Sequence, residues 1–264
     1  MKSLKEKLVQ EGLIRRQAEM DIRAKIEAWL KEHNITSYII NKDLTIDVYT
    51  NVRFYKFEGE EFPDFIQFGK CDGSFAMSYC EKLKSLRGCP REVQCSFACI
   101  ACPKLKSLKY CPEICRGGFR MSTCPITSME YAPKYIGDVL DMKSTDIKSL
   151  EGLPDQESLI QVNLQGCQNL ESLKGSPEKV RSFSCCDCTN LETLEGGPEE
   201  VRYEFYCMRC PKLTSLNGMP KRIGGKMYCG DCGKKFSRAD AKKAGNIEVR
   251  ELSNREASHA LIMR

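Results

Sequence analysis

The segment VRSFSCCDCTNLETLEGGP, residues 180–198, contains the pattern that decides the fold. Its first, fourth and sixth residues are apolar, a further cysteine stands three places later, and two leucines precede a Gly-x-Pro turn. Closely similar pieces occur at 102–108 (CPKLKSL), 167–173 (CQNLESL) and 210–216 (CPKLTSL). Similar segments that return along one chain are typical of a repeat protein.

Two classes of residue return with the same period of about 22 residues. The fourth residue of the pattern is taken by Phe75, Phe97, Phe119, Leu140, Val162, Phe183, Phe205 and Met227. The prolines are Pro90, Pro112, Pro133, Pro154, Pro177, Pro198 and Pro220. Each piece such as Phe183 to Cys185 has the alternation of a short strand, with two side chains inward and one outward. The period therefore predicts a stack of short parallel strands that buries one continuous core.

The repeat resembles the leucine-rich repeat, whose consensus is L-x-x-L-x-L-x-x-N/C-x-L in units of roughly 20–29 residues. Val180, Phe183 and Cys185 take its first three apolar places, and Cys188 takes the Asn/Cys place. The resemblance covers residues 73–235, and most copies carry one extra residue before the next leucine. It implies an α/β-type solenoid, a right-handed coil with about eight short parallel strands. The Cys-rich form with L-x-S-L-x-G-x-P is similar to repeat proteins encoded by tailed bacteriophages, which implies a host bacterial cytoplasm.

The residues on either side of the solenoid (73–235) are expected to cover its two ends, because an open end would expose the core. Residues 1–72 predict a helix over 3–33, with Gly12 as a candidate break, and a β-hairpin that turns at 41–43. Residues 236–264 predict a helix with Ser237 as N-cap and Gly245 as terminator. A last strand over 246–252 and a short helix over 253–264 are expected to follow.

Composition limits the classes of function. The net charge of +5, from 41 basic and 36 acidic residues, is small for a dedicated nucleic-acid binder. No apolar stretch reaches the length of about 18 residues that a membrane span needs. Charges interrupt every apolar run in residues 1–13, so no signal-peptide core is expected there. Seventeen cysteines without such a signal favour free thiols in a reducing cytoplasm.

Four Cys-x-x-Cys pairs suggest zinc when taken alone. Their first members are Cys99, Cys185, Cys207 and Cys229, whereas other repeats hold Met77, Met121, Met142 or Leu164 at that place. Because leucine cannot bind a metal, we interpret both cysteine columns as small buried side chains and expect neither metal nor cofactor. Disulfides along a column are disfavoured too, since in-register strands hold the sulfur atoms about 4.8 Å apart. If any thiol is reactive, we expect it outside the columns, among Cys71, Cys89, Cys95, Cys111, Cys115 and Cys186.

No pattern indicates catalysis. The segment YCGDCGKKFSR, residues 228–238, resembles the start of a two-Cys, two-His zinc finger, but Gly245 stands where that motif needs a histidine. The chain has only His33 and His259, neither of them near a predicted repeat strand, and no GxxxxGKS phosphate loop. We therefore expect a protein that is not an enzyme.

The outward residues of the strands would form one face that continues from repeat to repeat and can bind a partner. Tyrosine and arginine are frequent hot-spot residues of protein interfaces, which favours a protein partner. The candidate partner-binding residues are Arg120, Asp141, Lys143, Asn163, Gln165, Tyr206, Met208, Arg209 and Tyr228.

These patterns predict a non-enzymatic protein-binding module, such as a viral factor that binds or inhibits a protein of a bacterial host. Two alternatives stay open. The basic N-terminal helix, with Arg15, Arg16 and Arg23, could bind the phosphates of a nucleic acid, although charges on a helix are also typical of a solvated surface. The chain could instead be a structural scaffold or a virion component.

Overall fold

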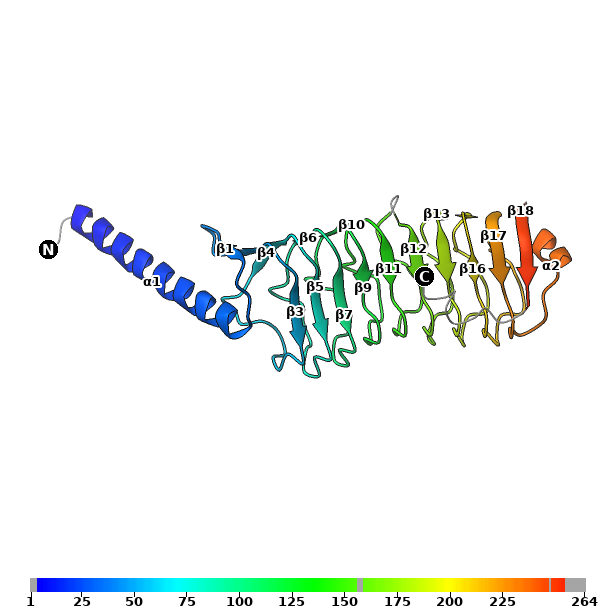
Figure 1. The fold of residues 1–264 in the computed structure, drawn as a ribbon, viewed down its shortest axis with the longest axis horizontal. Helices are drawn as coiled ribbons and strands as arrows, with labels where there is room; N and C mark the ends of the chain where they lie inside the picture. The colour runs from blue at the N-terminus through cyan, green and yellow to red at the C-terminus, as the bar shows by residue number, and fades with distance from the viewer. Residues whose placement is uncertain (1–3, 156–158, 247, 255–264) are drawn as a thin grey trace.

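The protein is a parallel-strand β-solenoid of about 9 turns with a long helix at its N-terminal end (Figure 1). The computed structural model describes residues 4–155, 159–246 and 248–254 of the 264-residue chain. The turns stack in one row, so that residues about 22 positions apart lie side by side (Figure 1). Within the described residues, no helix has the length and apolar character that crossing a bilayer requires.

The main ladder of the solenoid consists of the strands that the period predicts. Phe75 pairs with Phe97 and Phe97 with Phe119, in the register expected for a parallel stack. The ladder also begins before residue 73, because Val52 pairs with Phe75. Its strands are β3 (Val52–Tyr55), β5 (Phe75–Ser78), β7 (Phe97–Ile100), β9 (Phe119–Arg120), β11 (Val139–Asp141), β12 (Gln161–Asn163), β14 (Ser182–Ser184), β16 (Phe205–Tyr206) and β17 (Arg222–Tyr228).

Stacked phenylalanine rings form the centre of the core. The rings of Phe75 and Phe97 are 6.0 Å apart and those of Phe97 and Phe119 are 5.9 Å apart, with interplanar angles of 11° and 13°. Phe183 and Phe205 repeat this contact at 5.5 Å further along. The alternation of the strands places every one of these rings inside, where all are fully buried. The predicted continuous core is confirmed.

A second ladder of shorter strands runs beside the main ladder, and the sequence analysis did not predict it. Its inward residues include Cys71, Val93 and Cys115, which pair with one another from turn to turn. These two cysteines are therefore buried, whereas Cys95, from the same group outside the two columns, is exposed. The strands are β4 (Phe68–Cys71), β6 (Glu92–Val93), β8 (Ile114–Cys115), β10 (Tyr135–Ile136), β13 (Lys179–Val180) and β15 (Glu200–Val201), and the first half of β17 continues the series.

Between residues 73 and 235 the chain forms no helix, as far as its described residues extend. The two ladders are connected instead by turns that contain the buried leucine pairs, such as Leu191 and Leu194. The glycine of each Gly-x-Pro turn has a positive φ, for example +80° at Gly218. Two repeats place Tyr110 and Tyr131 in this left-handed conformation, with φ of 70° and 67°. The turn conformation thus persists even where the glycine is replaced.

Helix α1 (Leu4–Glu32) is continuous through Gly12 and projects away from the solenoid (Figure 1). Its last two turns attach it to the stack, where Ile26, Trp29 and Leu30 are buried. The Arg23 guanidinium donates hydrogen bonds to the carbonyls of Ile40 and Asn41, at 3.1 and 2.8 Å. One of the basic residues considered for nucleic-acid binding therefore anchors the helix to the following segment.

The predicted hairpin is confirmed by the antiparallel pair β1 (Tyr38–Ile40) and β2 (Ile46–Val48). Strand β2 then pairs with β4 in parallel, so the hairpin is part of the second ladder as well as the start of the stack. Ile46 and Val48 are accordingly buried.

The other end of the stack contains the predicted helix and strand. Helix α2 (Arg238–Lys243) has Ser237 as its N-cap in a capping box with Asp240, and Gly245 follows it with φ of +88°. Strand β18 (Glu248–Ser253) pairs in parallel with β17. Residues 255–264, which include most of the short helix expected over 253–264, lie outside the described residues.

Candidate functional site

The outward residues of the main ladder form the candidate binding face. They alternate with the buried phenylalanines and stand opposite one another across neighbouring strands, as in the pair of Arg120 and Asp141. We call this series the first outward column. It consists of Arg53, Ala76, Ala98, Arg120, Asp141, Asn163, Ser184, Tyr206 and Tyr228.

A second outward column lies two residues further along each turn. Its carbonyl groups accept hydrogen bonds of 2.8–3.0 Å from backbone N–H groups of the preceding turn. The donors have a left-handed conformation, as at Asp187 (φ 60°) and Arg209 (φ 55°), so the chain bends away directly after the column. This second outward column consists of Ser78, Ile100, Ser122, Lys143, Gln165, Cys186, Met208 and Gly230.

Charged side chains of the middle turns are paired with one another. The Arg120 guanidinium lies 3.8 Å from the carboxylate of Asp141. The other oxygen of Asp141 accepts a hydrogen bond of 3.0 Å from the backbone N–H of Lys143. The amine of Lys143 adds a positive charge to the same region, so this part of the face has mixed charge.

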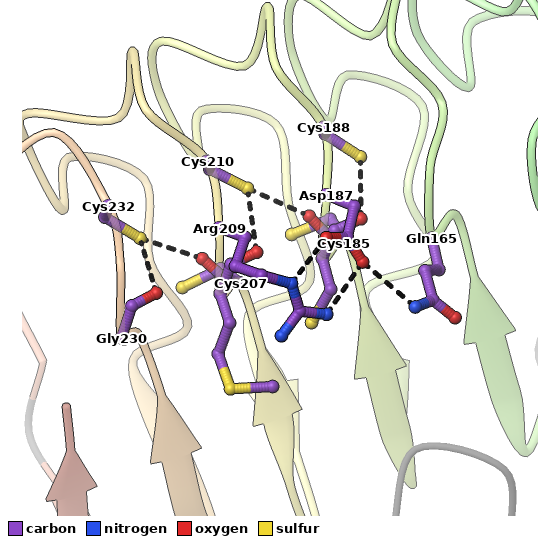
Figure 2. A network of polar contacts seen from close by, with 11 residues as sticks. Gln165, Cys185, Asp187, Cys188, Cys207, Arg209, Cys210, Gly230 and Cys232 are labelled. Carbon is purple, nitrogen blue, oxygen red and sulfur yellow. Dashed lines mark hydrogen bonds and ion pairs between the residues drawn. The ribbon is translucent and has the colours of Figure 1, made fainter. Parts of the chain in front are cut away.

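A polar network links three turns further along (Figure 2). The Asp187 carboxylate accepts hydrogen bonds from Nε and Nη2 of Arg209, at 2.5 and 2.8 Å. The amide of Gln165 donates to the same carboxylate at 3.0 Å. Both charged side chains are about one-third exposed, so this bidentate pair sets the orientation of Arg209 at the edge of the face.

Exposure divides the face into two halves. In the half built from the first turns, which we call the open half, Ala98 is buried and the other outward residues are partly or fully exposed: Arg53, Ala76, Ser78, Ile100, Arg120, Ser122, Asp141 and Lys143. The half built from the later turns is buried, and we call it the closed half: Asn163, Gln165, Ser184, Cys186, Tyr206 and Met208.

The structure places the nine candidate residues on or beside one face, but their exposure to solvent differs. Arg120, Asp141 and Lys143 lie in the open half, whereas Asn163, Gln165, Tyr206 and Met208 lie in the closed half. Arg209 and Tyr228, which border the closed half, are partly exposed. The sequence analysis missed Arg53, which precedes the visible repeat. The spacing of 23 residues between Val52 and Phe75 was the available signal.

The cysteine columns have a structural explanation in hydrogen bonds between turns (Figure 2). The second cysteine column consists of Cys80, Cys102, Cys124, Cys167, Cys188, Cys210 and Cys232, and each of its thiols donates to a backbone carbonyl of the preceding turn. Cys188 donates to Leu164 at 3.2 Å, and Cys210 donates to Cys185 at 3.2 Å. In one turn Thr145 takes the cysteine place, and its hydroxyl donates to Met142. This place in the repeat is therefore occupied by a small, buried side chain that can donate a hydrogen bond.

Burial also determines the chemistry of these thiols. It raises the pKa of Cys99 and Cys185 well above the ordinary thiol value, because an apolar interior disfavours the thiolate. The thiolate is the form that binds metals and attacks electrophiles. No group of three or more His, Cys, Asp or Glu side chains suited to a metal ion occurs in the described part of the chain.

His33 has a packing role. The His33 ring stacks on Trp29 with centroids 4.0 Å apart, and its Nδ1 lies 2.9 Å from the Trp29 carbonyl. His33 therefore contributes to the packing of helix α1 against the first turns. His259 lies outside the described residues.

No family model, no curated protein and no solved structure matches this chain. The residues of the face must therefore be interpreted from their own chemistry.

Thiol reactivity tests this description of the cysteines. We expect Cys95, the one exposed cysteine among the described residues, to react with N-ethylmaleimide first at pH 8 in the folded, reduced protein. Cys99 and Cys185 should stay unmodified over the same time, because burial suppresses their thiolates. Peptide mapping by mass spectrometry measures each site, and the unfolded chain serves as the control for full reactivity. Modification of Cys99 as fast as Cys95 would contradict the buried columns.

Proposed function

We propose that this protein is a non-enzymatic binding module that holds a protein partner on the open half of its face. The observation that supports the proposal is the exposure of Arg120, Asp141 and Lys143 side by side on a rigid ladder. Mixed charges on a rigid surface favour a specific partner with complementary charges over a uniformly charged polymer. The resemblance to leucine-rich repeats agrees with this proposal, since such solenoids use their strand faces for binding.

A bacterial host protein is the partner that we propose, and the host cytoplasm is the proposed location. Both come from the similarity of the Cys-rich repeat to phage-encoded repeat proteins. Nucleic acid is disfavoured as a partner of helix α1, because acidic residues such as Glu11, Glu19 and Asp21 lie among its arginines. Arg23, for example, lies 3.2 Å from Glu19 as well as bonding to the hairpin.

Two matched double variants test the proposed face. We expect Arg120→Ser with Lys143→Ser to reduce partner capture at least about tenfold, since each lost charged contact contributes on the order of 1 kcal/mol. Serine is already present in both outward columns, at Ser122 and Ser184, so the fold should tolerate the change. The measurement is affinity capture from a bacterial lysate with the immobilised, reduced protein, followed by mass spectrometry.

The control removes the same charge elsewhere. Lys104→Ser with Lys106→Ser alters two exposed lysines of a connecting turn and should leave capture unchanged. Equal capture by both double variants would place the interaction outside the open half. Capture of nucleic acid alone, and only at low salt, would instead support binding by helix α1.

A further inference from the structure

The main ladder has an open edge at its first strand. Strand β3 ends the strand order of this sheet, and in Figure 1 it is the outermost strand of the ladder on the side of helix α1. The second ladder differs at this end, because the hairpin adds β1 beside β2. An unpaired strand edge can accept a further strand from another chain.

Backbone groups at this edge are available for pairing. Val52 donates its N–H to the carbonyl of Ser74 in the next turn, at 2.8 Å. Successive residues of a strand direct their backbone groups to opposite sides, so the N–H and C=O groups of Arg53 and Tyr55 point away from β5. Within the described part of the chain, these groups form no hydrogen bond. Both side chains are exposed, which leaves the edge accessible.

An aromatic pocket of about 510 Å³ adjoins the edge, between the end of helix α1 and β3. The ring of Phe54 lies 5.8 Å from Trp29, 5.6 Å from His33 and 5.7 Å from Phe57, and all four residues line the pocket. Phe54 is an inward residue of β3. A strand added beside β3 would therefore direct the side chain opposite Phe54 into this pocket, where an apolar group fits best.

Two cations border the edge. Arg53 and Lys56 are exposed, and neither forms an ion pair within the described residues. The Lys56 ammonium lies 5.4 Å from the centre of the Tyr55 ring. These charges disfavour a second copy of the chain as the added strand, because two β3 strands would bring like charges together. They favour an acidic strand instead.

The acidic residues of the pocket do not cancel this charge. Glu58 and Glu61 already pair with basic residues of the next turn, Lys82 at 2.9 Å and Arg87 at 3.3 Å. Glu32 is the third acidic residue that lines the pocket. One carboxylate thus remains against two cations, and the edge keeps a positive charge.

We propose that β3 binds an acidic, extended peptide segment of a partner, which adds one strand to the open edge. Its backbone pairs with Arg53 and Tyr55, an acidic side chain lies on the outer side beside Arg53, and an apolar side chain enters the aromatic pocket. In such strand addition, backbone hydrogen bonds provide affinity and side-chain pockets provide specificity.

This inference goes beyond the proposed function, because it concerns the end of the ladder and not the outward columns. Arg53 is the only residue common to both proposals. The test below uses synthetic peptides and no lysate, so either proposal can fail while the other holds.

The probes are acetylated hexapeptides in which Glu alternates with Val or Phe, a pattern that is the same in both strand directions. We expect them to bind the full chain at least about tenfold more tightly than peptides with Lys in place of Glu. Arg53→Ser with Lys56→Ser should remove this preference. Serine occupies both places in other turns, at Ser184 and Ser144, so the fold should tolerate the change. Fluorescence anisotropy of labelled peptides measures the binding.

Two substitutions of Tyr55 separate backbone pairing from side-chain contacts. Tyr55→Pro removes the outward N–H, which the pairing with β5 does not use, and edge strands tolerate proline at such a position. Tyr55→Ser removes the same side chain but keeps the N–H. We expect the proline variant to bind the Glu peptides at least about tenfold more weakly than the serine variant, because the donor is lost and the ring blocks the added strand.

Hydrogen exchange tests the pairing without any substitution. With the Glu peptide bound, the amides of Arg53 and Tyr55 should exchange at least about tenfold more slowly, whereas the amide of Val52, already bonded to Ser74, should change little. Equal binding of Glu and Lys peptides, or binding without slower exchange at these two amides, would overturn the proposal. Slower exchange that appears on raising the protein concentration alone would also overturn it, because a second copy would then be the added strand.

Discussion

The variant Phe97→Ala is expected to lose about 4 kcal/mol of the free energy of unfolding, the usual cost of removing a buried aromatic ring. Phe97 is fully buried and stacks on Phe75 and Phe119 at 6.0 and 5.9 Å. Few side chains can move to fill the cavity, because each turn of a solenoid contacts only its two neighbours. The resulting cavity would therefore interrupt the stack between its first and later turns.

Urea unfolding followed by the fluorescence of Trp29 measures this effect. Trp29 packs on Phe54, which in turn contacts Phe75, so the indole reports on the turns next to the substitution. The adjacent outward residue supplies the control, because Ala98→Ser should change the unfolding free energy by less than about 1 kcal/mol. A loss below about 1.5 kcal/mol in Phe97→Ala would show that the phenylalanine stack does not hold the turns together.

The variant Gly218→Ala is expected to lose about 3 kcal/mol. The φ of +80° at Gly218 is unfavourable for any residue with a Cβ atom, and that atom would lie 2.3 Å from both N and Cα of Glu195 in the preceding turn. Backbone atoms cannot move aside as the end of a side chain can. The two turns would have to separate, which breaks the backbone hydrogen bond that Leu194 donates to Asn217.

Gly245→Ala is the matched control for this prediction. Gly245 has a similar φ of +88°, but no heavy atom of the described residues lies within 4 Å of the added Cβ. Its substitution should therefore cost only the conformational preference, about 1 kcal/mol. Circular dichroism during urea unfolding compares the two variants. Equal losses in both would mean that the close approach of neighbouring turns contributes nothing beyond the backbone conformation.

Much of the fold could be predicted because a solenoid repeats one local unit, a short strand followed by a turn. Phe183 and Cys185 alternate with Ser184 as a strand requires, and the period places each of them beside its equivalent in the next turn. The second ladder was harder to predict, because its strands are short and contain a single inward residue, such as Val93 or Ile136, among polar neighbours. One apolar residue has no periodicity of its own.

The candidate site, too, could be predicted only in part. The sequence alone determined which residues share the outward columns, since a parallel register of constant period leaves no choice of partner for Arg120 or Tyr206. Only the tertiary structure decided that Arg120 is accessible while Tyr206 and Met208 are buried. The register follows from the length and pattern of each repeat, and these are nearly the same along the chain. Exposure depends on how neighbouring side chains pack on one another, as Tyr206 does on Tyr228, and the period alone does not specify that.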